Sequence, residues 1–449
     1  MKKTLSIVLT AAMLASTLLT GCNGGSGQSG AAQSGSAKSS GSNNSPVTVS
    51  FWGAAISEDR KPFFADFQKK VHETYPNITL DFLGVPGSLD DYRQKLDVAI
   101  NAGTAPDITN DFRPFLVSNG YYQNLNDYFD KWDKKDEINP QLIKSNKTYD
   151  PKGTGLYALP YSSQTWNLWV HPDWLKEAGM SVPTNWNDFF TAVQKMTNKS
   201  KNRYGLAIRG GAGSANTLEM LMYSYSGITN YFTPDGKSTI NDPKNVEFVE
   251  KYLGCYNKYT AQDDLTKSWT QLANAFQSGK AGIVAHNLGS GASMTKAFNG
   301  DTTKYMAAMF PASDKGYVVH PGLMPLGISM SSASKDKDSV WKVMTLYLSK
   351  DVNLAYGKLY GEIPANTEAA KDSFFKNTQY MSVGVNLETS DKVKFNDTPY
   401  YIPSYTNIQA QMESSIQKVM GGQMSAKEML DKWASLLQKA YADYKSAKK

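Results

Sequence analysis

Short patterns that could carry catalysis are present in this sequence, but each lacks the residues that its chemistry requires. Residues 293–296 have the S-x-x-K spacing in which a lysine activates a serine nucleophile, yet the spacing recurs elsewhere and the Ser-Asp-Asn and Lys-Thr-Gly partner motifs are absent. Gly25, Gly27 and Gly30 form a G-x-G-x-x-G pattern without the preceding strand that a dinucleotide site needs. The histidines are far apart: His72, His171, His286 and His320. Because none has metal-ligand spacing, we expect neither a metal site nor another cofactor.

The first residues have the layout of a leader followed by an attachment point. A basic start and an apolar stretch over 4–19 end in Leu19-Thr20-Gly21-Cys22. This stretch is shorter than the roughly 20 residues that cross a bilayer, and its end resembles the lipobox of bacterial lipoproteins. In those proteins the chain is cut before the cysteine, whose sulfur carries a diacylglycerol. We therefore expect 1–21 to be a lipoprotein signal peptide and Cys22 the lipidated residue; an ordinary signal peptide is the alternative.

Residues 22–46 are mostly glycine and serine after the cysteine, and they contain no large apolar side chain. Such a segment cannot bury enough surface to fold, so we expect a disordered tether. A lipid followed by a tether predicts a body at the extracellular face of the cell membrane, attached through the lipid only.

The composition of the body excludes several classes of function. Over the full chain, 47 basic and 41 acidic residues give a net charge of only +6 and are scattered, so we expect no nucleic-acid partner. One cysteine, Cys255, lies in the body, and we expect it to be a small buried residue rather than a catalytic thiol. About 400 residues exceed one ordinary core, which predicts two lobes.

Strands and helices alternate from residue 47 onward. Strands are predicted at 47–52, at 78–83 and from 106, with helices between them, the first capped by Ser57. The same alternation returns later, with strands at 204–208 and 281–285. Apolar residues at helical spacing predict further helices over 186–196, 269–276, 340–348 and 430–444. We expect an α/β fold in which the aromatic residues of these helices, Trp186 and Trp269 among them, pack in the core.

Five segments in order, with their companions, resemble the extracellular solute-binding proteins of carbohydrate ABC importers, the group that includes the maltose-binding protein. They are 47–53 (VTVSFWG), 99–108 (AINAGTAPDI), 155–161 (GLYALPY) with 168–170 (LWV) and 182–186 (VPTNW), 275–283 (AFQSGKAGI), and 322–328 (GLMPLGI) with 361–365 (GEIPA). No single segment is specific, but the ordered set behind a lipobox and a tether indicates the family.

The resemblance implies a type II periplasmic-binding-protein-like fold, in which crossing hinge strands join two α/β lobes around a ligand cleft. It places 47–160 and 312–360 in one lobe, and 161–311 and 361–449 in the other. It further implies a monomer that captures a mono- or oligosaccharide and delivers it to the permease subunits of an ABC importer, and that is not an enzyme. Two alternatives are a binding protein for a non-sugar solute such as a peptide, and a surface-anchored polysaccharide-degrading enzyme, whose paired carboxylates would leave no local motif.

The same resemblance suggests which residues contact the ligand, since a sugar offers hydroxyl edges to polar groups and an apolar face to aromatic rings. The candidates follow predicted strands or the predicted lobe crossing: Trp52, Asn110, Asp111, Arg113, Tyr161, Gln164, Trp166, Arg209, His286, Asn287 and His320. The alternatives are a surface ion pair for the Asp111 group, a core position for Trp166, and no stacking role at His286 and Asn287, where the usual Gly-Trp pattern is missing. Arginines and histidines in a cleft would suit an acidic sugar, whereas arginines acting as plain hydrogen-bond donors would suit a neutral one.

Overall fold

The computed structural model describes residues 45–86, 89–150, 153–321, 324–396 and 398–447. The predicted signal peptide, Cys22, most of the tether and the G-x-G-x-x-G pattern lie outside these residues. Within them, no helix combines the length and the apolar composition that crossing a membrane requires.

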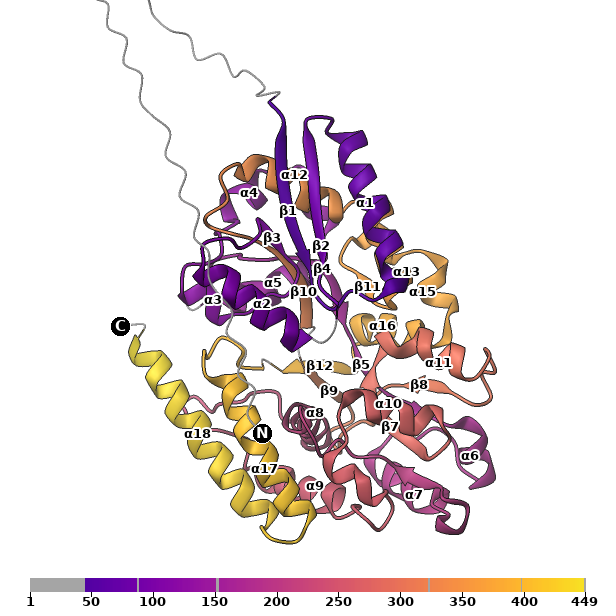
Figure 1. The fold of residues 1–449 in the computed structure, drawn as a ribbon. Helices are drawn as coiled ribbons and strands as arrows, with labels where there is room; N and C mark the ends of the chain where they lie inside the picture. The colour runs from indigo at the N-terminus through magenta and orange to yellow at the C-terminus, as the bar shows by residue number, and fades with distance from the viewer. Residues whose placement is uncertain (1–44, 87–88, 151–152, 322–323, 397, 448–449) are drawn as a thin grey trace, which may run out of the picture. The chain divides into compact units, whose positions relative to one another are not determined.

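A six-stranded sheet organises the first lobe (Figure 1). The strands lie in the order β11 (Ile363–Pro364), β4 (Leu159–Gln164), β10 (Met324–Met330), β3 (Ile108–Thr109), β1 (Val47–Gly53) and β2 (Ile78–Gly84). Strand β1 is parallel to β2 and β3, whereas β10 is antiparallel to β3 and β4. The alternation of apolar and polar residues in β1 buries Val49 and Phe51 in the core of this lobe.

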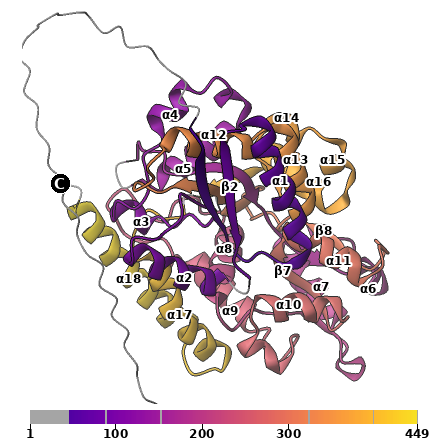
Figure 2. The same cartoon turned by 45° about the horizontal axis from the view of Figure 1, so that its top comes forward.

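The helices of the first lobe surround this sheet (Figure 2). They are α1 (Lys61–Thr74), α2 (Leu89–Asn101), α3 (Phe115–Ser118), α4 (Asn126–Lys131), α5 (Pro140–Thr148), α12 (Lys337–Tyr347), α13 (Lys350–Tyr360) and α14 (Thr367–Ala370). Ser57 does not cap α1 as expected: a 3-10 turn (Glu58–Arg60) comes first, the Ser57 side chain makes no capping hydrogen bond, and Arg60 occupies the N-cap.

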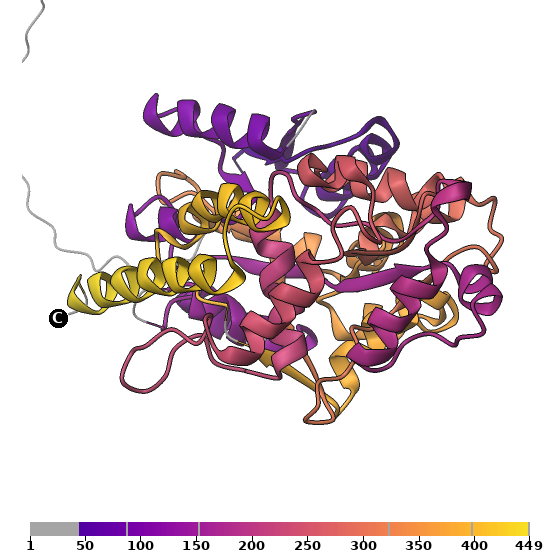
Figure 3. The ribbon, with the colours of Figure 1, turned by 90° about the horizontal axis from the view of Figure 1, so that it is seen from below.

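A four-stranded sheet organises the second lobe. The strands lie in the order β6 (Tyr204–Leu206), β7 (Ala281–Asn287), β5 (Trp166–Val170) and β8 (Met306–Ala308). Its helices include the long pair near the C-terminus, drawn yellow in Figure 3. They are α6 (Pro172–Glu177), α7 (Trp186–Met196), α8 (Ser214–Ser226), α9 (Pro243–Leu253), α10 (Trp269–Gln277), α11 (Gly291–Ala297), α15 (Ser373–Asn377), α16 (Gln379–Thr389), α17 (Tyr405–Met420) and α18 (Ala426–Ala447).

The chain passes between the two sheets more than once, and the crossings lie a few residues from the predicted boundaries. Residues 161–164 and Ile363–Pro364 pair within the first sheet, although the sequence placed them in the second lobe. Strand β9 (Val318–Pro321), which pairs with β12 (Val393–Asn396), packs into the second core, although the sequence placed 312–360 in the first lobe. Apolar residues flank each crossing on both sides, so the hydrophobic pattern does not mark where a strand changes sheets.

Two aromatic residues make a further contact between the lobes. Tyr149 follows α5 in the first lobe, and Tyr400 precedes α17 in the second. Their ring centroids are 6.0 Å apart in an edge-to-face arrangement, and Tyr149 in turn lies 5.4 Å from the Phe112 ring.

Cys255 is a buried free thiol, as expected, and burial raises its pKa to about 11.

The core of the second lobe yields a stability prediction at Trp186. This side chain is 4% exposed and packs against Phe189, Tyr225 and Phe248. We expect Trp186→Ala to lower the free energy of unfolding by about 3–5 kcal/mol, because it removes a large buried ring and leaves a cavity. Urea unfolding followed by circular dichroism measures the change; a loss below about 1 kcal/mol would show that the ring is not part of the core.

Candidate functional site

A cavity of about 550 Å³ is lined by side chains from both lobes. Two larger cavities, of about 700 and 660 Å³, are each confined to one lobe. We therefore take the shared cavity as the candidate site. Its lining comprises Ala54, Arg60, Leu89, Asn110, Asp111, Tyr161, Trp269, Thr270, Ala273, Asn274, Gln277, His286, Asn287, Gly289, Ser290, Ser293, Leu326, Tyr356, Tyr360 and Glu362.

The first-lobe wall is formed where parallel strands end. Strands β1 and β3 run in the same direction, so the residues after them, Ala54 and then Asn110 and Asp111, meet at one edge of the sheet. The Asn110 side-chain oxygen accepts a hydrogen bond from the backbone N–H of Ala54 at 2.8 Å. The two turns are thereby fixed to each other beside the cavity.

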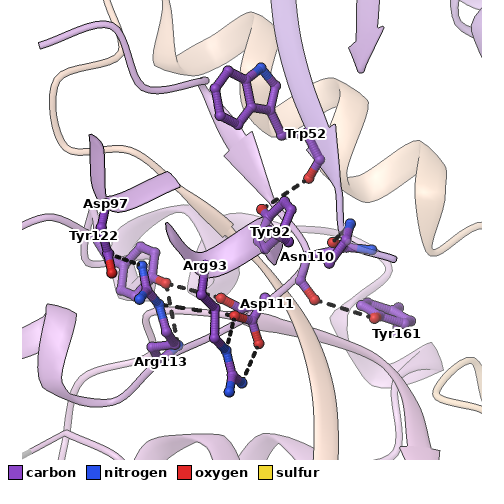
Figure 4. A network of polar contacts seen from close by, with 10 residues as sticks. Trp52, Tyr92, Arg93, Asp97, Asn110, Asp111, Arg113, Tyr122 and Tyr161 are labelled. Carbon is purple, nitrogen blue, oxygen red and sulfur yellow. Dashed lines mark hydrogen bonds and ion pairs between the residues drawn. The ribbon is translucent and has the colours of Figure 1, made fainter. Parts of the chain in front are cut away.

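Asp111 is 9% exposed and forms a bidentate ion pair with Arg93 (Figure 4). The Arg93 Nε and Nη2 atoms donate to the two carboxylate oxygens at 2.8 and 2.9 Å. Arg113 lies behind this pair and outside the lining; its Nη2 donates to Asp97 at 2.6 Å, while its Nε is 4.0 Å from Asp111. The predicted trio is therefore split: Asn110 and Asp111 lie at the cavity, whereas Arg113 lies behind them in the loop before α3 and is held by Asp97 of α2.

Trp52 lies at the end of β1 but outside the cavity lining. Its indole packs against the small cluster of Tyr92 and Leu96, and Lys95 Nζ is 5.2 Å from its ring centroid. The Trp52 carbonyl accepts a hydrogen bond from the Tyr92 hydroxyl at 3.2 Å (Figure 4).

The crossing between the lobes contributes Tyr161 from β4. Tyr161 is 3% exposed, and its ring lies edge-to-face on Tyr356 at 4.9 Å. Gln164 ends β4, and the structure does not describe its side chain. Trp166 begins β5 in the second core, and His320 lies beside it, with Nε2 at 3.1 Å from the Trp166 carbonyl; neither lines the cavity.

The second-lobe wall is built around Trp269, which the sequence assigned to the core. Trp269 is the first residue of α10, and because the helix begins there its ring stays partly exposed and lines the cavity. His286 stacks on one side of it with ring centroids 3.4 Å apart, and Trp166 lies edge-to-face at 4.9 Å. Arg209 places its guanidinium carbon 5.1 Å from the Trp269 centroid. Arg209 and Trp166 thus support a ring that reaches the cavity, while His286 and Asn287 line it themselves.

The electrostatics of the lining are close to neutral. Burial lowers the pKa of His286 to about 3, so its ring is uncharged at neutral pH. Burial raises the pKa of Glu362 to about 7, with hydrogen bonding from Ser162 and the charge of Arg60 acting in the opposite direction. Asp111 is neutralised by Arg93.

Sequence reasoning missed Arg60, Tyr360 and Glu362, which lie on the first-lobe side of the cavity. The Arg60 guanidinium carbon is 4.0 Å from the Tyr360 ring centroid, and Glu362 accepts a hydrogen bond from the Ser162 hydroxyl at 2.6 Å. Glu362 falls within the family-like segment 361–365, which was the available indication. In the described residues, no group of three His, Cys, Asp or Glu side chains could bind a metal ion.

This arrangement offers a ligand an aromatic face and hydrogen-bonding groups of both kinds. The rings of Trp269 and Tyr360 can contact an apolar face, and amides, hydroxyls and carboxyl groups surround them. Binding of a ligand with polar edges and an apolar face is chemistry that this lining supports.

Comparison with known proteins identifies the family. Residues 55–354 match the family of bacterial extracellular solute-binding proteins. A putative binding protein of Brucella abortus is 25% identical over 340 residues, which cover 72% of this chain and 77% of that protein.

Solved structures share the fold. An ABC transporter solute-binding protein from Thermotoga lettingae, bound with α-D-tagatose, matches with a TM-score of 0.72 and 20% identity over 88% of this chain and 99% of that one. The GacH receptor of Streptomyces glaucescens, solved unliganded and with acarbose, gives the same score, identity and coverage. The predicted two-lobed α/β fold is confirmed.

The buried Glu362 carboxyl predicts a pH dependence of stability. Its pKa in the folded protein, about 7, exceeds the ordinary value of 4.5, so the folded protein retains a proton that the unfolded chain releases. The contribution of this carboxyl to the free energy of unfolding is fully present below about pH 4.5 and is lost as the pH rises through about 7. We expect Glu362→Gln to remove this contribution, so that the variant gains stability relative to the parent as the pH rises from 5 to 8.

Urea unfolding of the parent and of Glu362→Gln at several pH values from 5 to 8 measures the difference between their free energies of unfolding. The difference is the useful quantity because burial lowers the pKa values of His171, His286 and His320, which acts in the opposite direction on total stability. Exposed Glu73→Gln serves as the control and should run parallel to the parent. A pH-independent difference for Glu362→Gln would show that this carboxyl is ionised throughout.

Proposed function

The chain belongs to the bacterial extracellular solute-binding proteins, and on that premise we propose that it captures a sugar or oligosaccharide between its lobes and delivers it to an ABC import permease. The observation that carries the proposal is the cavity lined by both lobes, in which the Trp269 ring faces a set of polar groups. A ligand that contacts both walls favours the arrangement in which the lobes are close. The shift from separated to close lobes is then the signal that a transporter can sense.

The charge balance supports a neutral sugar. Asp111 is paired with Arg93, His286 is uncharged, and Arg60 lies near a carboxyl group whose pKa is about 7. The named ligands of the structural neighbours, tagatose and acarbose, are consistent with a hydroxyl-rich ligand. An acidic sugar would use Arg209, whose guanidinium stacks on Trp269.

A mutational prediction concerns the ligand contacts. We expect Trp269→Ala to weaken sugar binding by about 1–3 kcal/mol, because it removes a stacking surface. Asp111→Asn should also weaken binding, because it unpairs Arg93 at the cavity wall. Trp52→Ala is the matched control, since its ring lies outside the lining. Titration calorimetry measures the affinities.

The ligand for that titration is found by a thermal-shift screen with tagatose, mannitol, maltose, trigalacturonate and a tripeptide. A ligand at 100 times its dissociation constant adds roughly 2.7 kcal/mol of stability. If only the tripeptide stabilises the protein, the carbohydrate proposal fails. In a separate incubation with a polysaccharide, the appearance of new reducing ends would indicate an enzyme instead. If Trp52→Ala weakens binding and Trp269→Ala does not, the ligand contacts the residues that the sequence indicated.

A further prediction concerns attachment to the membrane. We propose that Cys22 is lipidated and that this lipid is the membrane attachment of a monomer acting at the extracellular face. Cys22→Ala should leave the protein in the medium or in unprocessed form, because two acyl chains supply the stable attachment. Fractionation and mass spectrometry of the mature protein measure this. A variant that is processed normally and stays with the membrane would contradict the anchor.

A further inference from the structure

A second concave surface lies on the first lobe, away from the cavity described above. It is a groove of about 660 Å³ between α4 with the turn after it and the start of α12. None of its lining residues lines the cavity between the lobes. From its geometry and charge we infer that this groove, hereafter the α4–α12 groove, is a second carbohydrate-binding site, independent of the cleft.

Three aromatic rings form the apolar part of the α4–α12 groove. Tyr128 belongs to α4, Trp132 follows it directly, and Trp341 lies on α12. The Tyr128 and Trp341 rings are 5.3 Å apart and inclined by 35°, whereas Trp132 and Trp341 are 6.0 Å apart and nearly perpendicular, at 84°. The rings therefore form a floor and a wall rather than a flat surface.

These rings are held firmly although they remain partly exposed. Trp132 and Trp341 both pack against the core of the first lobe, and Trp132 also contacts Phe129 edge-to-face at 6.2 Å. Their outer faces line the groove, where a ligand can stack without any rearrangement of the rings. Preorganised aromatic surface of this kind is a feature of binding sites, because the entropy of ordering it has already been lost on folding.

The polar groups around the rings have mixed charge. Asp127, Asp133 and Asp338 contribute carboxylates, and Lys131 and Lys342 contribute ammonium groups. Among the described residues, the side chains of Asp127, Lys131 and Asp133 make no hydrogen bond or ion pair with another residue. Both donors and acceptors are thus free at the edges of the groove.

This combination favours a carbohydrate over other ligand classes. The three carboxylates and two ammonium groups nearly balance, so the lining selects strongly for neither a cation nor an anion, and an apolar helix would bury these charged groups at a high cost. A pyranose ring satisfies all three features, because its hydroxyls donate to carboxylates and accept from ammonium groups while its C–H face lies on an indole. The volume falls within the range of about 300–1,000 Å³ that small-molecule sites occupy.

A second site would change how the protein meets its ligand. A polymer bound in the α4–α12 groove is held on the same molecule as the cleft, which raises the effective concentration of its chain ends or fragments at the cleft. The inference does not require that the cleft itself binds sugar, so the two proposals can fail separately.

Affinity electrophoresis of the full chain tests the inference directly. The protein is run through native gels that contain amylopectin, xylan, galactomannan or polygalacturonate. We expect slower migration in at least one gel. That retardation should persist in Trp269→Ala, in the cleft, and should weaken by about tenfold in Trp132→Ala, because a stacking surface is removed. Asp133→Ala, at an exposed position outside the core, should weaken the retardation in the same gel.

Phe115→Ala is the matched control, because this aromatic residue of the first lobe is 38% exposed and lies outside both sites. Unretarded migration of the parent in all four gels overturns the inference. Loss of retardation in Trp269→Ala, with Trp132→Ala unchanged, assigns the polymer to the cleft and overturns it as well. The fluorine resonance of 5-fluorotryptophan at position 132 reports binding in the groove itself. A shift of this resonance with tetramethylammonium, and with none of the polysaccharides, would make the groove a cation site and overturn the inference.

Discussion

Strand β4 leaves the first sheet at Gln164, and β5 begins the second sheet at Trp166. The single residue between them, Thr165, is 2% exposed, and its carbonyl accepts a hydrogen bond from the Leu288 N–H at 3.0 Å. Because β4 is paired on both sides, with β10 and β11, its backbone cannot shift without breaking two ladders. This continuity fixes Tyr161 at the floor of the cavity and brings the ends of β3 and β7 opposite each other.

Buried amides stabilise this crossing. The Asn353 side chain donates to the Tyr161 carbonyl at 2.7 Å and accepts from the Asn366 N–H at 2.9 Å. Both asparagines are fully buried, so each hydrogen bond prevents the cost of leaving a polar group unpaired. The bidentate Arg93–Asp111 pair has the same role on the first-lobe wall, where it keeps a carboxylate at the cavity edge without an uncompensated charge.

The sequence predicted the elements better than the site. Helices such as α7 and α12 and the strand β7 were recognisable because their apolar spacing is regular and their ends carry caps or glycine. Strand ends suggested Asn110, Asp111, His286 and Asn287 as ligand contacts, and all four line the cavity, since parallel and antiparallel strands bring their ends to a sheet edge. Helical spacing alone, however, cannot distinguish a core position from the first turn of a helix, and for this reason Trp269 was assigned to the core.

Other parts of the site could not be predicted from local pattern. Arg60 and Glu362 are about 300 residues apart, and they reach the same cavity through tertiary contacts, among them the pairing of β11 with β4 and the contact of Arg60 with the Tyr360 ring. Trp52 and Trp166 carry the right side chain for stacking, but their strands direct both rings into packed clusters. Gln164, by contrast, remains a prediction from the sequence.

The edge-to-face contact of Tyr149 with Tyr400 has a consequence for the unliganded protein. Such a pair contributes about 0.5–1.5 kcal/mol beyond area burial, and separating the lobes at this point removes it. The contact therefore shifts the resting population toward the arrangement with the lobes together by roughly two- to tenfold. For a ligand that binds this arrangement, less of the intrinsic binding free energy is lost to reorganisation of the lobes. Its apparent affinity therefore rises by up to the same factor, although neither tyrosine belongs to the binding surface.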